Sequence, residues 1–324
     1  MKKSVYRTIA LLLMFMLIFS GCSGPSATET EGEEGQPDEI AEQRTFAIVY
    51  PIVHPFFEPV TEEAQKYADS IGVELLTYAP DKPDARQQVE ILENLIAMKV
   101  DGIAVVPTDS ETIAPIVNKA IDTGIQVIAF ESDIPKSNRA GFQGTDNYKA
   151  GLALGEEIAK RLDGKGKLIV ATGLPTQLSL NQRLDGMKEA LESYPDVEIL
   201  DIQSGQGDPT ITMNVIESMI QAYSDFDVFS GIDATGGPMA VAVWKAKGWT
   251  KDDKMIITFD NVPENVQGVK DGIITSLISQ KQWLWGEQLI KDLTTLCDGG
   301  SVPNYVDTGN VVIDINNVDT YMEE

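Results

Sequence analysis

From residue 45 onward, the chain alternates between short apolar runs and longer segments with helical periodicity. The apolar runs, such as 103–106, are nearly continuous and do not alternate with polar residues. Continuous apolar strands between amphipathic helices predict a parallel sheet that is covered by helices on both faces. The predicted strands are 45–50, 73–78, 102–106, 125–130, 166–172, 197–203, 227–231, 255–260, 273–279 and 309–315, and the predicted helices are 56–71, 84–99, 111–123, 146–162, 180–193, 209–223, 237–247, 263–271 and 283–297.

The alternation restarts near Gly144-Thr145, so the chain contains two successive runs of strands and helices. Its 324 residues suffice for two cores, because single domains cluster at about 100 to 150 residues. We therefore predict an α/β fold with two doubly wound, Rossmann-like lobes of similar size. In open sheets of this kind, ligands bind in the crevice outside the carboxyl ends of the strands.

The composition excludes several classes of function. The chain has 50 acidic and 25 basic residues, and this excess argues against nucleic acid as a partner, since phosphate contacts need clustered Lys and Arg. It has one histidine and two cysteines, so we predict no metal site. Its loops lack a Gly-x-Gly-x-x-Gly cradle, a Walker-type loop and a Gly-x-Ser-x-Gly elbow. We therefore predict no cofactor and no enzymatic activity.

The amino-terminal segment has the layout of a secretion signal. Basic residues at 2, 3 and 7 precede an apolar run at 9–19, which is shorter than the roughly 20 residues that span a bilayer. Ser20-Gly21 then precedes Cys22, which resembles the lipobox of bacterial lipoproteins, although Phe19 stands where that family usually has Leu. The resemblance implies that residues 1–21 are removed and that Cys22 becomes a lipid-modified amino terminus. The alternative is an ordinary signal peptide with an incidental cysteine.

The segment that follows, residues 22–44, is acidic and almost free of large apolar side chains. Such a composition cannot bury enough surface to offset the entropy lost on ordering. We predict that it is a disordered tether between a lipid anchor and the folded lobes.

The loop 50–57 follows the first predicted strand and therefore lies where ligands bind in such folds. It contains the single histidine, His54, and two adjacent aromatic residues, Phe56 and Phe57. Two prolines stiffen it. We expect this loop to form one wall of a ligand-binding cleft.

Short motifs recur at strand ends and helix starts along the chain. In order they are Pro55-Phe56-Phe57, Val105-Val106-Pro107-Thr108-Asp109-Ser110, Gly144-Thr145-Asp146-Asn147, Gly151, Arg183-Leu184-Asp185-Gly186, Phe259-Asp260 and Gln280. No single motif is distinctive, but the ordered set is. It resembles the ribose/galactose type of periplasmic sugar-binding proteins, and the resemblance runs from about residue 45 to the carboxyl end.

The resemblance implies a substrate receptor of an ABC importer, located outside the cytoplasm. It implies three crossings between an amino-terminal lobe, 45–144 with 281–307, and a carboxyl-terminal lobe, 145–280 with 308–324. The ligand, a carbohydrate or polyol, lies between the lobes and is buried when the hinge closes. We expect a monomer that contacts permease subunits. A ligand sensor that acts on a membrane histidine kinase or chemoreceptor is the alternative.

The resemblance also implies the ligand-binding residues. Phe56 is expected to stack on a sugar ring, and His54 occupies a position where the family often has an Asn that contacts hydroxyls. Asp260 matches the acidic ligand residue of the family. The full set of candidate binding residues is Tyr50, His54, Phe56, Phe57, Glu131, Ser132, Asn181, Asp233, Asp260 and Gln280.

Several positions depart from the ribose type. Ser132 and Asn181 stand where those proteins carry ligand-binding arginines. The second stacking aromatic of the family would fall near Gly207, which has no side chain to stack. Arg183 matches a position that is more often structural. These changes favour a ligand other than ribose. Trp283 or Trp285 is a candidate replacement for the aromatic missing at Gly207.

Overall fold

The computed structural model describes residues 43–323. The predicted signal peptide, Cys22 and almost all of the tether lie outside these residues. The first lobe is built on a six-stranded sheet in which every strand is parallel to its neighbours. In spatial order its strands are β11 (Tyr305–Asp307), β5 (Gly141–Gly144), β4 (Gln126–Phe130), β3 (Gly102–Val105), β1 (Thr45–Val49) and β2 (Glu74–Tyr78).

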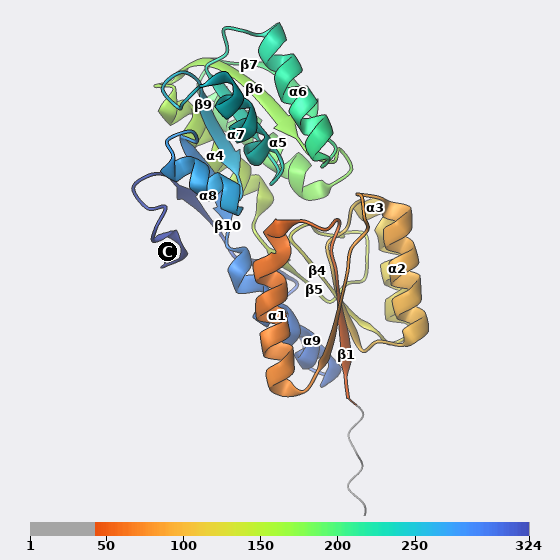
Figure 1. Cartoon of the computed structure of the whole chain (residues 1–324). Helices are drawn as coiled ribbons and strands as arrows, with labels where there is room; N and C mark the ends of the chain where they lie inside the picture. The colour runs from red at the N-terminus through yellow and green to blue at the C-terminus, as the bar shows by residue number, and fades with distance from the viewer. Residues whose placement is uncertain (1–42, 324) are drawn as a thin grey trace, which may run out of the picture. The chain divides into compact units, whose positions relative to one another are not determined.

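Helices cover both faces of this sheet, as continuous apolar strands require. On one face, Phe46 and Ile48 of β1 pack against helices that come from opposite ends of the chain. On the other face, Ala47 and Val49 pack against the two helices that follow β2 and β3. Figure 1 shows the first pair as α1 (Glu58–Ile71) and α9 (Trp285–Cys297), and the second as α2 (Ala85–Met98) and α3 (Ser110–Asp122).

The second lobe repeats this plan. Its six-stranded sheet is parallel except for β12, which runs antiparallel to β10. In spatial order the strands are β12 (Asn310–Ile313), β10 (Ser276–Gln280), β9 (Met255–Phe259), β8 (Val228–Gly231), β6 (Lys165–Thr172) and β7 (Asp196–Ser204). The helices are α4 (Asn147–Arg161) and α5 (Leu178–Glu192) on one face, and α6 (Pro209–Ala222), α7 (Gly236–Lys247) and α8 (Pro263–Lys270) on the other.

The predicted fold class, two doubly wound α/β lobes, is thus confirmed. Two short strands were not predicted from the sequence, β5 and β11. Half of the residues of β5 are glycines, which have a low preference for strands, and β11 has only three residues. Within residues 43–323, no helix has the length and apolar composition needed to cross a membrane.

The chain passes between the two sheets three times: before α4, before α9 and between β11 and β12. These three connections are hydrogen-bonded to one another. Thr145 in the first connection donates its hydroxyl to the carbonyl of Gly309 in the third, at 3.0 Å. The indole Nε1 of Trp285, just after the second, donates to Thr308 Oγ1 at 2.9 Å. The connections therefore form one bonded unit.

A buried glutamine fixes the ends of the strands in the first lobe. Gln88 of α2 is fully buried. Its Nε2 donates to the carbonyls of Tyr50 (3.2 Å) and Val106 (2.7 Å), and its Oε1 accepts the N–H of Thr108 at 2.9 Å. This single side chain therefore connects the loops that follow β1 and β3.

Replacing this residue, Gln88→Leu, should destabilise the protein by about 3 kcal/mol, because it leaves several buried backbone groups unpaired at about 1 to 3 kcal/mol each. Chemical denaturation would measure the loss. The matched control is Gln288→Leu on α9, since Gln288 is exposed and bonds only to Asp292 one turn away. Equal stability of the two variants would contradict the role given to Gln88.

Candidate functional site

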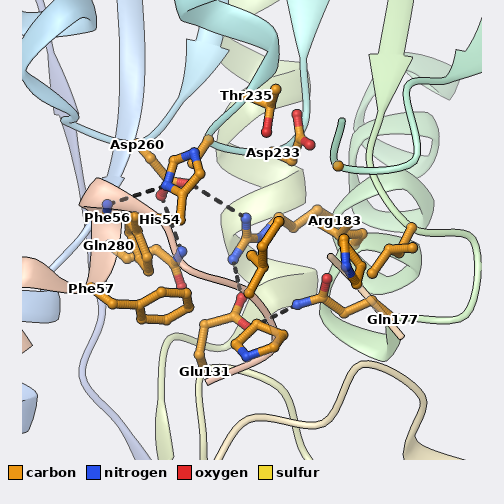
Figure 2. A pocket seen from close by; sticks show the side chains of 17 residues that line it. His54, Phe56, Phe57, Glu131, Gln177, Arg183, Asp233, Thr235, Asp260 and Gln280 are labelled. Atoms are coloured by element: carbon orange, nitrogen blue, oxygen red, sulfur yellow. Dashed lines mark hydrogen bonds and ion pairs between the residues drawn. The ribbon is translucent and has the colours of Figure 1, made fainter. Parts of the chain in front are cut away.

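A cavity of about 80 Å³ lies between the carboxyl ends of the two sheets. Both lobes contribute to its wall, and Figure 2 shows side chains from each pointing toward a common centre. The lining residues are Pro51, Ile52, His54, Phe56, Phe57, Pro83 and Glu131 from the first lobe, and Leu174, Gln177, Leu180, Arg183, Gly207, Asp233, Ala234, Thr235, Asp260 and Gln280 from the second.

Seven of the ten predicted binding residues line this cavity: His54, Phe56, Phe57, Glu131, Asp233, Asp260 and Gln280. They come from the ends of five strands, β1, β4, β8, β9 and β10, and the parallel sheets bring these ends together. Glu131 follows β4 directly and Asp260 follows β9, and both have left-handed backbones, with φ of 59° and 69°. This conformation costs a non-glycine residue about 1 to 2 kcal/mol. Such strain often marks binding sites.

The first-lobe wall is aromatic. Phe56 and Phe57 form the short helix η1 (Pro55–Phe57), and their rings meet edge to face with centroids 5.0 Å apart. Trp285 supports Phe56 from behind at 6.0 Å, and Tyr50 supports Phe57 at 4.7 Å. The two phenylalanine rings are largely buried and are held in place by these neighbours, so they present a rigid apolar face to the cavity.

His54 caps the short helix η1 through one ring nitrogen and keeps the other available as a hydrogen-bond donor. Its Nδ1 accepts the backbone N–H of Phe56 at 3.2 Å and caps η1. Burial lowers the pKa of the imidazole, and Glu264 in the other lobe opposes this effect. The neutral ring with an accepting Nδ1 carries its proton on Nε2. His54 can therefore donate a hydrogen bond through Nε2.

Arg183 connects both lobes beneath the cavity. Its Nη2 donates to Glu131 Oε1 at 2.9 Å, and its Nε donates to Asn147 Oδ1 at 2.7 Å. Its Nη1 donates to the carbonyl of Ile232 at 3.3 Å and lies 3.9 Å from Asp260 Oδ2. Figure 2 shows the guanidinium between the two carboxylates. Because Arg183 is almost fully buried, these contacts take the place of its lost hydration.

Close helix packing positions Arg183 on α5. A Cβ atom on Gly151 of α4 would lie 2.2 Å from the carbonyl of Arg183, and one on Gly186 of α5 would lie 2.1 Å from the carbonyl of Tyr148. Only glycine fits at these points. The two helices therefore approach backbone to backbone, which fixes the position of the arginine.

Three buried carboxyl groups share this one arginine. Burial raises the pKa of Glu131 and of Asp233, and the positive charge of Arg183 only partly offsets the effect. Burial likewise raises the pKa of Asp260 to about 6, against the influence of Arg183 and a hydrogen bond from Gln280. The cavity therefore has a surplus of acidic groups.

Gln280 donates its Nε2 to Asp260 Oδ1 at 3.0 Å. Its Oε1 is buried and has no hydrogen-bond partner among residues 43–323. Because Gln280 lines the cavity, this acceptor is available to a donor from a ligand or from water.

The remaining three predicted residues do not line the cavity. Tyr50 lies behind Phe57, and its hydroxyl bonds to Thr61 Oγ1 at 2.7 Å. Ser132 Oγ accepts the N–H of Ser179 at 3.2 Å, so it caps the start of α5 from the opposite lobe. Asn181 is exposed and donates to the carbonyl of Pro175 at 2.9 Å. Trp283 and Trp285 also lie outside the lining set.

Sequence reasoning gave too small a role to Arg183 and missed Gln177, whose Nε2 donates to Glu131 Oε2 at 3.0 Å. It also missed the apolar residues Leu174 and Leu180. Their position in the sequence could have identified two of them, because Leu174 and Gln177 lie in the loop between β6 and α5, at the carboxyl end of a strand.

The raised pKa of Asp260 predicts a pH dependence of stability. The folded group titrates at about 6 and the unfolded group at 3.8, so between these values the folded state binds more protons. Stability should therefore fall as pH rises from about 4 to 6, by up to about 3 kcal/mol. The variant Asp260→Asn should lose this dependence and gain stability at pH 7, as urea titrations across pH would measure. The exposed Asp252→Asn is the control, and an unchanged slope in Asp260→Asn would contradict the prediction.

Comparisons with known proteins place this fold in a family. The model of the periplasmic binding protein domain matches residues 46–301. The D-ribose/D-allose-binding protein of Pseudomonas aeruginosa is 26% identical over 297 residues, which are 87% of this chain and 90% of that protein.

Solved structures agree with this result. An ABC transporter solute-binding protein of Burkholderia graminis, in complex with D-arabinose, has a TM-score of 0.82 and 28% identity, covering 86% of this chain and 97% of that one. AraP, an arabinose-binding protein of Geobacillus stearothermophilus, has a TM-score of 0.72 and 27% identity, covering 86% and 99%. Because the family model spans most of the two lobes, this chain belongs to the periplasmic binding protein family.

Proposed function

We propose that this protein is an extracytoplasmic receptor that binds a neutral sugar or polyol between its lobes and delivers it to the permease of an ABC importer. The observation that carries the proposal is the composition of the cavity wall, with aromatic rings on one side and buried carboxylates, an arginine and an amide on the other. Ring faces suit the C–H faces of a sugar, and charged groups form the stronger hydrogen bonds with hydroxyls. The surplus of acidic groups disfavours an anionic ligand.

In this proposal, Phe56 and Phe57 contact the sugar face and His54 donates to a ring oxygen or hydroxyl. Asp233, Asp260 and Gln280 accept hydrogen bonds from the hydroxyl groups of the sugar. Glu131 acts with Arg183 at the base of the cavity, which they reach from opposite lobes. Tyr50, Ser132 and Asn181 do not contact the ligand and instead support the residues that do.

We further propose that the segments 45–144 with 281–307 and 145–280 with 308–324 move as two bodies around the bonded connections. Closure then excludes water from the bound ligand. The similarity to ABC transporter binding proteins favours import over the sensing alternative. The expectations of a monomer and of permease contacts belong to the same proposal.

The function can be tested by thermal shift against a panel of sugars and polyols. A ligand at 100 times its dissociation constant should stabilise the protein by about 2.7 kcal/mol. Asp260→Ala and Phe56→Ala should each lose most of that shift, measured from the melting temperature of the variant itself. The exposed Asp252→Ala should keep it. A full shift in both cavity variants would rule out the site, and no shift with any carbohydrate would contradict the proposed ligand class.

We also propose that Cys22 carries the lipid anchor, with residues 1–21 removed. In the native host, the Cys22→Ser variant should move from the membrane fraction to the medium or periplasm, because two or more acyl chains are needed for durable attachment. Fractionation and labelling with a radioactive fatty acid measure this. Ser23→Ala is the matched control and should remain labelled. Unchanged membrane attachment of Cys22→Ser would contradict the anchor.

A further inference from the structure

Strand order divides the cavity into two ends. In the second lobe, the order β10, β9, β8, β6, β7 places Gln280, Asp260 and Asp233 after the first three strands. Leu174 follows β6 and Gly207 follows β7, at the far edge of the same sheet. The lining residues thus change from polar to apolar along the sheet.

The polar end consists mainly of hydrogen-bond acceptors. Gln280 Oε1 is buried and unpaired among residues 43–323. Asp260 Oδ2 lies 3.9 Å from Arg183, beyond hydrogen-bond distance. Asp233 accepts one backbone N–H, from Gly236, at its Oδ1. This end therefore suits a ligand edge that carries several hydroxyl donors.

The other end is apolar on both lobes. Leu174 lines it from the second lobe, and Pro83, in the loop after β2, lines it from the first. Gly207 contributes no side chain, and a Cβ atom placed there would lie 3.5 Å from Pro83 Cγ. The loops of the edge strands β7 and β2 thus approach each other across this end of the cavity, with a glycine on one side and a proline on the other.

Three polar side chains between residues 176 and 181, in and after the loop that contains Leu174, are already bonded to protein. Gln177 donates its Nε2 to Glu131, Thr176 donates its hydroxyl to the carbonyl of Thr108 at 3.1 Å, and Asn181 donates to the carbonyl of Pro175. A ligand hydroxyl placed beside Leu174 and Pro83 would have to compete with these bonds for a partner.

We propose that the ligand is a deoxy sugar, with hydroxyls along one edge and a methyl or methylene carbon at the opposite edge. This inference rests on the proposed function and specifies its ligand class. A methyl group beside Leu174 and Pro83 gains burial of apolar surface. A hydroxymethyl group at the same place leaves a buried hydroxyl unpaired, which is unfavourable.

Isothermal titration with matched pairs of sugars tests the proposal. The pairs are D-fucose with D-galactose, 6-deoxy-D-glucose with D-glucose, L-rhamnose with L-mannose, and L-fucose with L-galactose. In every pair that binds, the deoxy member should bind at least about fivefold more tightly, the lower limit expected for one buried unpaired hydroxyl. Equal or tighter binding of the hydroxylated member would overturn the inference and leave the proposed function intact. No binding by any sugar would overturn both.

A variant at Leu174 tests whether a preference for the deoxy sugar comes from the apolar end of the cavity. Leu174→Asn places an amide beside the ligand, so it should strengthen binding of the hydroxylated member and bring the ratio within a pair close to one. Leu178→Asn is the matched control, since Leu178 is half-buried four residues further along and does not line the cavity. It should leave the ratio unchanged. An unchanged ratio in Leu174→Asn would assign the preference to another part of the site and overturn the role given to this end.

Discussion

The ion pair between Glu131 and Arg183 is the interaction on which the arrangement of the site depends. It joins the two lobes at the base of the cavity, and both partners are almost fully buried. Such a pair is stable only when its remaining hydrogen-bonding groups are satisfied. Gln177 and Asn147 provide this for the carboxylate and the guanidinium. Removing Arg183 would leave Glu131 buried without a counter-charge, whereas removing Glu131 would leave Arg183 with Asp260 at 3.9 Å but without its partner from the other lobe.

Much of the fold could be predicted from the sequence because the signals were local. Continuous apolar runs and helical periodicity identified ten of the strands and the nine α-helices between residues 43 and 323. The strands β5 and β11 were missed because their local signal is weak: half of the residues of β5 are glycines, and β11 has only three residues.

The site was predictable to the extent that it consists of residues at strand ends. His54, Phe56, Asp260 and Gln280 lie where the order of motifs placed them. Ser132 and Asn181 were expected in the site because their positions matched those of arginines. Their short side chains reach the backbone of α5 and of the preceding loop instead. The role of Arg183 depends on its burial and on charges from other strands, and neither can be read from neighbouring residues.

The bonded connections between the lobes determine what kind of motion the protein can make. Thr145 is bonded to Gly309, and Trp285 to Thr308, so no connection can slide along another without breaking a hydrogen bond. The connection between β11 and β12 is only two residues long and allows little translation. In the two-body movement proposed above, these links favour rotation near the connections over sliding of one lobe along the other. In such a rotation, the contacts across the cavity would form or break together.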